Sequence, residues 1–227
     1  MLAPTTGSQG GGMVWGKIVS LFRRNEAGPS YGSPKLEEQL DELRGYIARD
    51  LRGGYVDTGS IVDNALEVLE LMPHGEEVLR AHARRILEDE TAAYHHEAAG
   101  WPALTDHDRL EQAFAALETQ GVVCRQNFTC CGTCGVAEIG DEIDAARERG
   151  GPVHGYAFFH MQDTERAVEG GGLWLNYGAT DGGEAPALAI GHRIAEALRA
   201  AGLAVDWDGD WTKRIHVPLQ WQRRLAL

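Results

Sequence analysis

The sequence lacks the segments that would place the chain in a membrane or outside the cell. No apolar run approaches the roughly 20 residues that a membrane-spanning helix requires, so we expect no transmembrane segment. The sequence also shows no secretory-signal pattern, because the apolar stretch at residues 13–22 is short and runs into Arg23 and Arg24. Cysteine is absent from most of the chain, which argues against a secreted disulfide scaffold. We therefore expect a cytoplasmic protein.

Positive charge is scarce as well. The 227 residues include 21 Lys and Arg against 34 Asp and Glu, a net charge of −13. The arginines mostly alternate with acidic residues, as at residues 147–149, so they form no basic patch. A phosphate backbone would repel such a chain, and we expect no nucleic-acid partner. The apolar share of 43% and the charged share of 24% are typical of a globular protein.

Three regions follow one another along the chain. Residues 1–34 are predicted to form a disordered or loosely ordered leader. Its first 12 residues are rich in Gly, Ser, Thr and Pro and cannot bury enough apolar surface to order themselves, and Met13 could be the true start. Residues 13–24 combine a short apolar stripe with basic residues. This stripe has two interpretations: a helix that contacts a membrane surface or a partner, and a short helix packed loosely on its own domain. The second region, residues 35–104, is predicted to be helical, and the third, residues 105–227, to be an α+β domain.

Apolar residues recur with helical spacing in the second region. The pattern predicts three helices, over residues 36–51, 61–72 and 78–97. Glycine and proline separate these stretches, as expected at helix ends. A fourth helix, over residues 105–120, opens the third region, because the Thr-x-x-Asp spacing from Thr105 to Asp108 resembles a capping box.

From residue 122 the apolar period changes to two, which is typical of strands. The predicted elements are a strand over 122–128, a helix over 134–149, strands over 156–164 and 173–177, a helix over 185–201, and a hairpin of 203–207 and 215–221. The order β-α-β-β-α-β-β favours a ferredoxin-like, split βαβ sheet with an added edge strand. Both faces of residues 156–161 carry bulky side chains, so we expect helices on both faces of the sheet. The helix at 105–120, with help from 61–97, should cover the face that the sheet's own two helices leave open.

The four cysteines all lie within eleven residues, at Cys124, Cys130, Cys131 and Cys134. The last three fall where the predicted strand ends and the next helix begins. A helix N-terminus favours thiolate over thiol, and thiolate is the form that binds metal or attacks electrophiles. The segment is therefore a candidate site.

Metal binding is one chemistry that fits this segment. The Cys-Gly-Thr-Cys-Gly run at residues 131–135 has the shape of a zinc knuckle, in which small residues let backbone amides turn toward sulfur. A tetrahedral zinc site needs four ligands, and the usual second Cys-x-x-Cys is missing. Cys124 or Cys130 could supply one further ligand and His160 another, if the second strand runs beside the first.

Three other interpretations stay open. A Cys-x-x-Cys at a helix N-terminus is typical of thiol-disulfide exchange, although no proline is placed to face the pair. Cys130 or Cys131 could instead be a nucleophile, with His160 as its base and Asp163 or Glu165 orienting the imidazole. The thiols could also be packed side chains without a chemical role, because free cysteine is commonly buried as a small apolar residue.

Several motifs carry a resemblance to a known family. They are the Thr-Asp to Arg-Leu pattern at residues 105–110, Asn-Phe-Thr-Cys-Cys-Gly-Thr-Cys-Gly at 127–135, Gln-Asp-Thr-Glu-Arg-Ala-Val at 162–168 and Trp-Asp-Gly-Asp at 207–210. Over roughly residues 105–221 the chain resembles an uncharacterised family of bacterial domains of unknown function. The resemblance implies no activity. The family's motif does not include Cys124, which leaves Cys130, Cys131, Cys134 and His160 as the candidate metal ligands.

Two classes of function follow. In the first, the chain is a non-enzymatic regulatory or partner-binding domain, with a protein partner and a cysteine cluster that is structural or senses a metal such as zinc. In the second, it is a thiol-dependent enzyme, either a thiol-disulfide oxidoreductase or a Cys-His hydrolase or acyl transferase. The order of elements is also similar to that of ribonuclease-regulator ferredoxin-like domains, which are acidic and act by binding a protein; such a likeness concerns fold. We favour the first class, because the sequence does not contain a complete catalytic set.

Overall fold

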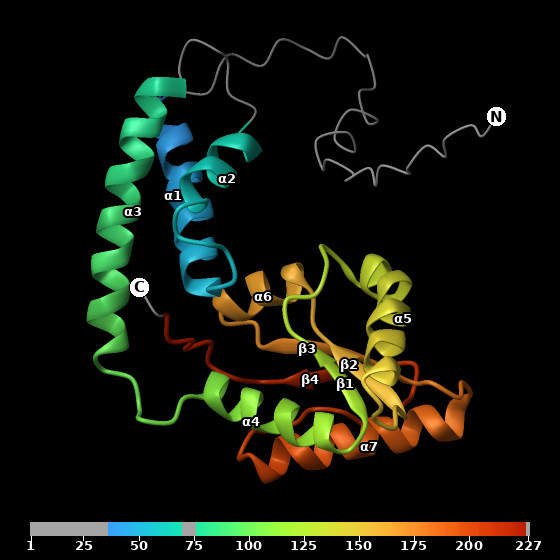
Figure 1. Cartoon of the computed structure of the whole chain (residues 1–227). Coiled ribbons are helices and arrows are strands. Elements are labelled where there is room, and N and C mark those ends of the chain that lie inside the picture. Colours follow the sequence, from blue (N-terminus) through green and yellow to red (C-terminus); the bar gives the residue numbers. More distant parts are fainter. Residues whose placement is uncertain (1–35, 70–75, 226–227) are drawn as a thin grey trace, which may run out of the picture. The chain divides into compact units, whose positions relative to one another are not determined.

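The computed structural model describes residues 36–69 and 76–225. Our predictions for the leader at residues 1–34, for the stripe at 13–24 and for a start at Met13 lie outside the described residues. The elements, in chain order, are α1 (Leu36–Gly53), α2 (Ile61–Val68), α3 (Glu76–Ala98), α4 (Asp106–Thr119), β1 (Val122–Arg125), α5 (Gly132–Glu148), β2 (Gly155–Phe158), α6 (Met161–Val168), β3 (Leu173–Ala179), α7 (Glu184–Ala200) and β4 (Ile215–Val217) (Figure 1). No helix among the described residues is both long enough and apolar enough to span a bilayer.

Helices α1, α2 and α3 pack on one another around a core of their own. Leu43, Ile47 and Leu51 recur every four residues along α1 and are almost completely buried. They meet Ile61 of α2 and Ala83 of α3 in the same apolar cluster. All three predicted helices are therefore confirmed, although α2 ends at Val68, before its predicted end.

Helix α4 begins at the predicted capping box. The Asp108 backbone N–H donates to Thr105 Oγ1 at 3.2 Å, and the Thr105 backbone N–H donates to Asp108 Oδ2 at 2.8 Å. These reciprocal bonds satisfy two amide groups that a helix start leaves without partners. They fix the residue at which α4 begins.

The four strands form one mixed sheet in the order β1-β2-β3-β4. Strand β1 is parallel to β2, with Cys124 opposite Ala157, whereas the β2–β3 and β3–β4 pairs are antiparallel. The α+β class is confirmed. The predicted ferredoxin-like arrangement is wrong, because a split βαβ unit inserts another strand between its two parallel strands and here β1 and β2 are hydrogen-bonded neighbours. The order of elements along a chain leaves this choice of pairing open.

Both faces of the sheet are covered, as the sequence predicts, but by a different set of helices (Figure 1). Cys124 of β1 packs with Leu110 of α4 and Ile194 of α7 on one face. The preceding residue, Val123, packs with Ile139 of α5 on the opposite face of the sheet. The sheet's own helices α5 and α7 thus lie on opposite faces, and α4 joins α7. Helices α2 and α3 belong to the separate core with α1, so their predicted contribution to the second face was wrong.

The predicted strand at residues 156–164 is only half right. Strand β2 ends at Phe158, and helix α6 begins at Met161, with His160 as its N-cap residue. The Asp163 carboxylate accepts a hydrogen bond from the His160 backbone N–H at 3.2 Å, which favours a helix start over a continued strand. The predicted final hairpin is similarly reduced, to strand β4 and a single bridge between Asp206 and His216.

Candidate metal centre

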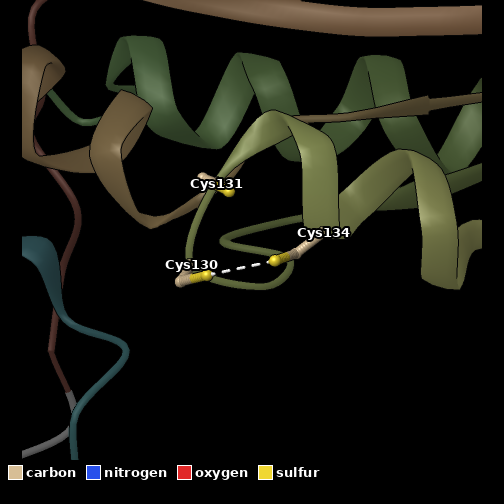
Figure 2. A group of neighbouring side chains, drawn as sticks. All are labelled: Cys130, Cys131 and Cys134. Carbon is tan, nitrogen blue, oxygen red and sulfur yellow. Dashed lines mark hydrogen bonds between the residues drawn. The ribbon is translucent and has the colours of Figure 1, made fainter. Parts of the chain in front are cut away.

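Three of the four cysteines come together at the start of α5. Cys131 is the N-cap residue of the helix, Cys134 lies in its first turn and Cys130 precedes both. Their Sγ atoms all lie within 4.8 Å of one another, and the Cys130 and Cys134 Sγ atoms face each other at 3.5 Å (Figure 2). Two sulfurs bound tetrahedrally to one zinc ion at about 2.3 Å each are about 3.8 Å apart, whereas a disulfide bond measures about 2.05 Å. The spacing therefore suits a shared ion and needs little movement to accept one.

The loop that carries Cys130 has an unusual backbone. Asn127 and Thr129 adopt positive φ angles of 50° and 59°. This left-handed conformation is strained for a β-branched residue such as Thr129, at about 1 to 3 kcal/mol. The loop is held by the turn between β2 and α6, where Phe128 N–H donates to Phe159 O at 2.8 Å and Met161 N–H donates to Thr129 O at 3.1 Å. Cys130 is consequently presented by a fixed loop.

Side chains and a close helix contact hold the motif further. Thr164 Oγ1 of α6 donates to Asn127 Oδ1 at 2.7 Å. Gly135 brings α5 close to β2, since a Cβ atom there would lie 2.6 Å from Phe158 Cζ. Packing therefore requires a glycine at Gly135, directly after the last cysteine of the motif. This close contact holds the N-terminus of α5 against the sheet.

The three thiols share their hydrogen bonds unequally. The pKa of Cys131 lies below its usual value, first because the Cys134 backbone N–H donates to its sulfur and then because the Cys134 and Cys130 thiols also bond to it. The pKa of Cys134 is raised to about 12, because its thiol is hydrogen-bonded to the Cys130 and Cys131 sulfurs and charge on those sulfurs would repel a further thiolate. The hydrogen bonds within the cluster thus favour thiolate at Cys131 and thiol at Cys134, and a bound cation would stabilise the thiolate form.

Cys124 does not join this cluster. It is 7% exposed, lies in the core beneath α4 and α7, and its Sγ lies 3.5 Å from Val122 O. Burial raises the pKa of its thiol. The exclusion of Cys124 that the family resemblance implied agrees with its position in the structure.

His160 lies beside the cysteine motif in a buried polar network. A Cβ atom on Gly132, the first residue of α5, would lie 3.5 Å from His160 Nε2. The same Nε2 is 3.0 Å from Asp163 Oδ2, and Asp163 also forms an ion pair with Arg214. Burial lowers the pKa of His160, and the nearby Asp163 carboxylate opposes the effect. His160 Nδ1 has no hydrogen-bond partner among the described residues.

The predicted site residues thus separate into those that approach the motif and those that do not. The three clustered cysteines converge, because the Sγ atoms of Cys130, Cys131 and Cys134 lie within 4.8 Å of one another. Within the described part of the chain, this group of ligand atoms does not include those of His160. Asp163 Oδ2 lies 3.0 Å from His160 Nε2, and its role in orienting the imidazole stays a prediction. Glu165 instead reaches Arg49 of α1, at 3.7 Å.

Arg214 and a second polar cluster, around Tyr55, have no counterpart among the predicted site residues. Tyr55 donates from its hydroxyl to Gln126 Oε1 at 2.6 Å and lies 3.5 Å from His107 Nε2. The His107 ring meets the Trp221 ring edge to face, with centroids 5.0 Å apart. These residues come from separate parts of the chain, and no local spacing could have revealed them.

The described chain is an α+β domain with a surface three-thiol cluster built on the loop between a strand and a helix. A family model described as a domain of unknown function, DUF6891, matches residues 36–225. The chain belongs to this family. The match starts at residue 36, so it includes the helices α1 to α3 that precede the region of resemblance, and the domain division at residue 105 stays a prediction. Neither the curated proteins nor the solved structures include a match to the chain.

Proposed function

We propose that the chain is a regulatory or partner-binding domain of the cytoplasm, in which Cys130, Cys131 and Cys134 hold one soft divalent ion such as Zn²⁺. The observation that carries the proposal is the convergence of three Sγ atoms within 4.8 Å on a fixed loop. Thiolates are the ligands that zinc prefers among soft donors, and the first turn of α5 supplies amide groups that stabilise their charge.

The surroundings of the cluster support binding of a partner. Cys130 is exposed, and Met161, whose backbone N–H donates to Thr129 O in the same loop, is 44% exposed. Exposed apolar side chains next to a polar site are typical of interaction surfaces. A metal ion there would lie where it could alter the affinity for a protein partner.

His160 is the candidate within the chain for a fourth ligand. Its Nε2 lies 3.0 Å from Asp163 Oδ2 and its Nδ1 has no hydrogen-bond partner among the described residues. Histidines that bind metal through one nitrogen commonly have a carboxylate beside the other. The ring would have to move toward the sulfurs to bind.

The proposal is tested by metal content. The full chain, reduced and equilibrated with Zn²⁺ before removal of free metal, should retain one zinc per chain by elemental analysis. Cys131→Ser and Cys134→Ser should each lose most of it, while Cys124→Ala, which removes the buried sulfur outside the cluster, should retain it. Circular dichroism of each variant shows that the fold is intact. Equal zinc in all four proteins would refute the metal centre.

Thiol chemistry is the second candidate, because hydrogen bonds from Cys134 lower the pKa of Cys131 and a His160–Asp163 pair lies beside the motif. Here Cys131 or Cys130 would be the nucleophile, His160 the base and Asp163 the group that orients it. The metal-free chain should then react with iodoacetamide at neutral pH faster than Cys131→Ser does. If wild type, Cys131→Ser and Cys130→Ser all react at the same rate, the enzymatic alternative is wrong.

A further inference from the structure

We infer that the ion held by Cys130, Cys131 and Cys134 keeps its fourth coordination position open and takes a thiolate there from outside the chain. The inference rests on the proposed metal centre and specifies how that centre is regulated. The external thiolate would belong to a small thiol or to a cysteine of a protein partner.

The count of available ligands is the first step. Within the described residues, the cluster of ligand atoms contains three sulfurs. The remaining cysteine, Cys124, is 7% exposed and lies in the core of the sheet. His160 is the N-cap residue of α6, its Nε2 lies 3.0 Å from Asp163 Oδ2, and its atoms lie outside the 4.8 Å group. Zinc takes four ligands, so a site with three leaves one position for an exchangeable group.

The exposure of the cluster is the second step. Cys130 is exposed, and Cys131 and Cys134 are each partly exposed. An ion bound to them would therefore lie at the protein surface, where a group from solution can reach it. Sites that are closed by four protein ligands are structural, whereas open sites exchange their fourth ligand.

The local chemistry favours a thiolate as that ligand. A site built from sulfur prefers ions that bind further soft donors more tightly than carboxylates. Helix α5 has no acidic residue in its first turn, so no carboxylate there would repel an incoming thiolate. The exposed side chain of Met161, whose backbone N–H donates to Thr129 O in the same loop, offers an apolar contact to the carbon atoms of a bound thiol or to residues around a partner's cysteine.

Cobalt substitution gives a direct test, since Co²⁺ replaces Zn²⁺ and reports sulfur ligands through charge-transfer absorption. The full chain is loaded with one equivalent of Co²⁺ without oxygen and titrated with glutathione. Addition of a fourth thiolate should raise the charge-transfer band by about one third, from three sulfur ligands to four. Parallel titration with a short peptide that has a cysteine between two leucines separates the two sources of thiolate. If the peptide reaches half-saturation at a tenfold lower concentration than glutathione, the ligand is a protein partner. If the peptide binds equally or more weakly, the ligand is a small thiol.

The wild-type response alone decides the inference. An unchanged or falling band would overturn it. His160→Gln, which retains a side-chain amide that can bond to Asp163, identifies one cause: if this variant responds and the wild type does not, the imidazole occupies the fourth position. A chain that shows no charge-transfer band with Co²⁺ refutes the metal centre itself, which is distinct from a centre that binds cobalt and ignores glutathione.

Discussion

The buried His107 should make the protein sensitive to mild acid. Its ring is 2% exposed, and burial lowers its pKa to about 4, with the nearby Arg223 adding to the effect. In the unfolded chain the same ring titrates near 6.5. Between these two values the unfolded state binds more protons than the folded state, so the free energy of unfolding falls as the pH falls. With 1.36 kcal/mol for each pH unit of difference, His107 should cost about 2 kcal/mol at pH 5 and about 3 kcal/mol at pH 4, relative to pH 7.5.

Urea unfolding at pH 7.5, 6, 5 and 4, followed by circular dichroism, measures this loss. The control is His107→Gln, which does not titrate in this range and can still hydrogen-bond to Tyr55. The variant should be less stable than wild type at pH 7.5, and the difference between the two should shrink by about 2 kcal/mol at pH 5. Taking this difference cancels other titrating groups, including His160, whose pKa is lowered in the same direction. Parallel pH profiles for the two proteins would show that His107 does not resist protonation.

Three further predictions concern the contact of α5 with β2, the Arg214–Asp163 ion pair and the hydrogen bonds of the C-terminal tail. Gly135→Ala should lower the free energy of unfolding by about 1 to 3 kcal/mol, because the new methyl group clashes with β2. Gly140→Ala is the control on the same helix: no atom lies within 4 Å of its new methyl group, so it should raise the free energy of unfolding by up to about 1 kcal/mol in the same urea assay. Arg214→Gln should cost about 2 to 3 kcal/mol by leaving the buried Asp163 carboxylate without its cation, and a double-mutant cycle with Asp163→Asn should recover part of the loss; additive effects would contradict the pair. Tyr94→Phe should cost about 1 to 2 kcal/mol, because its hydroxyl bonds two backbone groups of the C-terminal tail; proteolysis of the tail at an unchanged rate would count against this role.

Local patterns predicted the helices well because each has an apolar face and clear end signals. The Thr105–Asp108 cap and the apolar repeat along α1 depend on residues within a few positions of one another. Helix α6 was missed because the run of bulky side chains on both faces of β2 continues into Phe159 and His160, and that signal outweighed the acidic residue at Asp163 in the first turn. The strand pairing was misjudged for a different reason, since contacts between strands far apart in sequence leave no periodic trace.

The cysteine cluster shows what local sequence patterns can predict and what depends on the fold. Its existence and its candidate residues could be predicted from spacing alone, but the choice among the four thiols depends on the fold. The period of two along β1 places Cys124 on the face covered by α4 and α7, so its sulfur is in the core despite its closeness in sequence. Cys130 faces Cys134 because the strained backbone at Thr129 is held by the turn between β2 and α6. That turn comes later in the chain and ends at the cap made by Asp163. The thiol centre is therefore an assembly of two strand-to-helix connections, and the Cys-x-x-Cys spacing supplies only one of them.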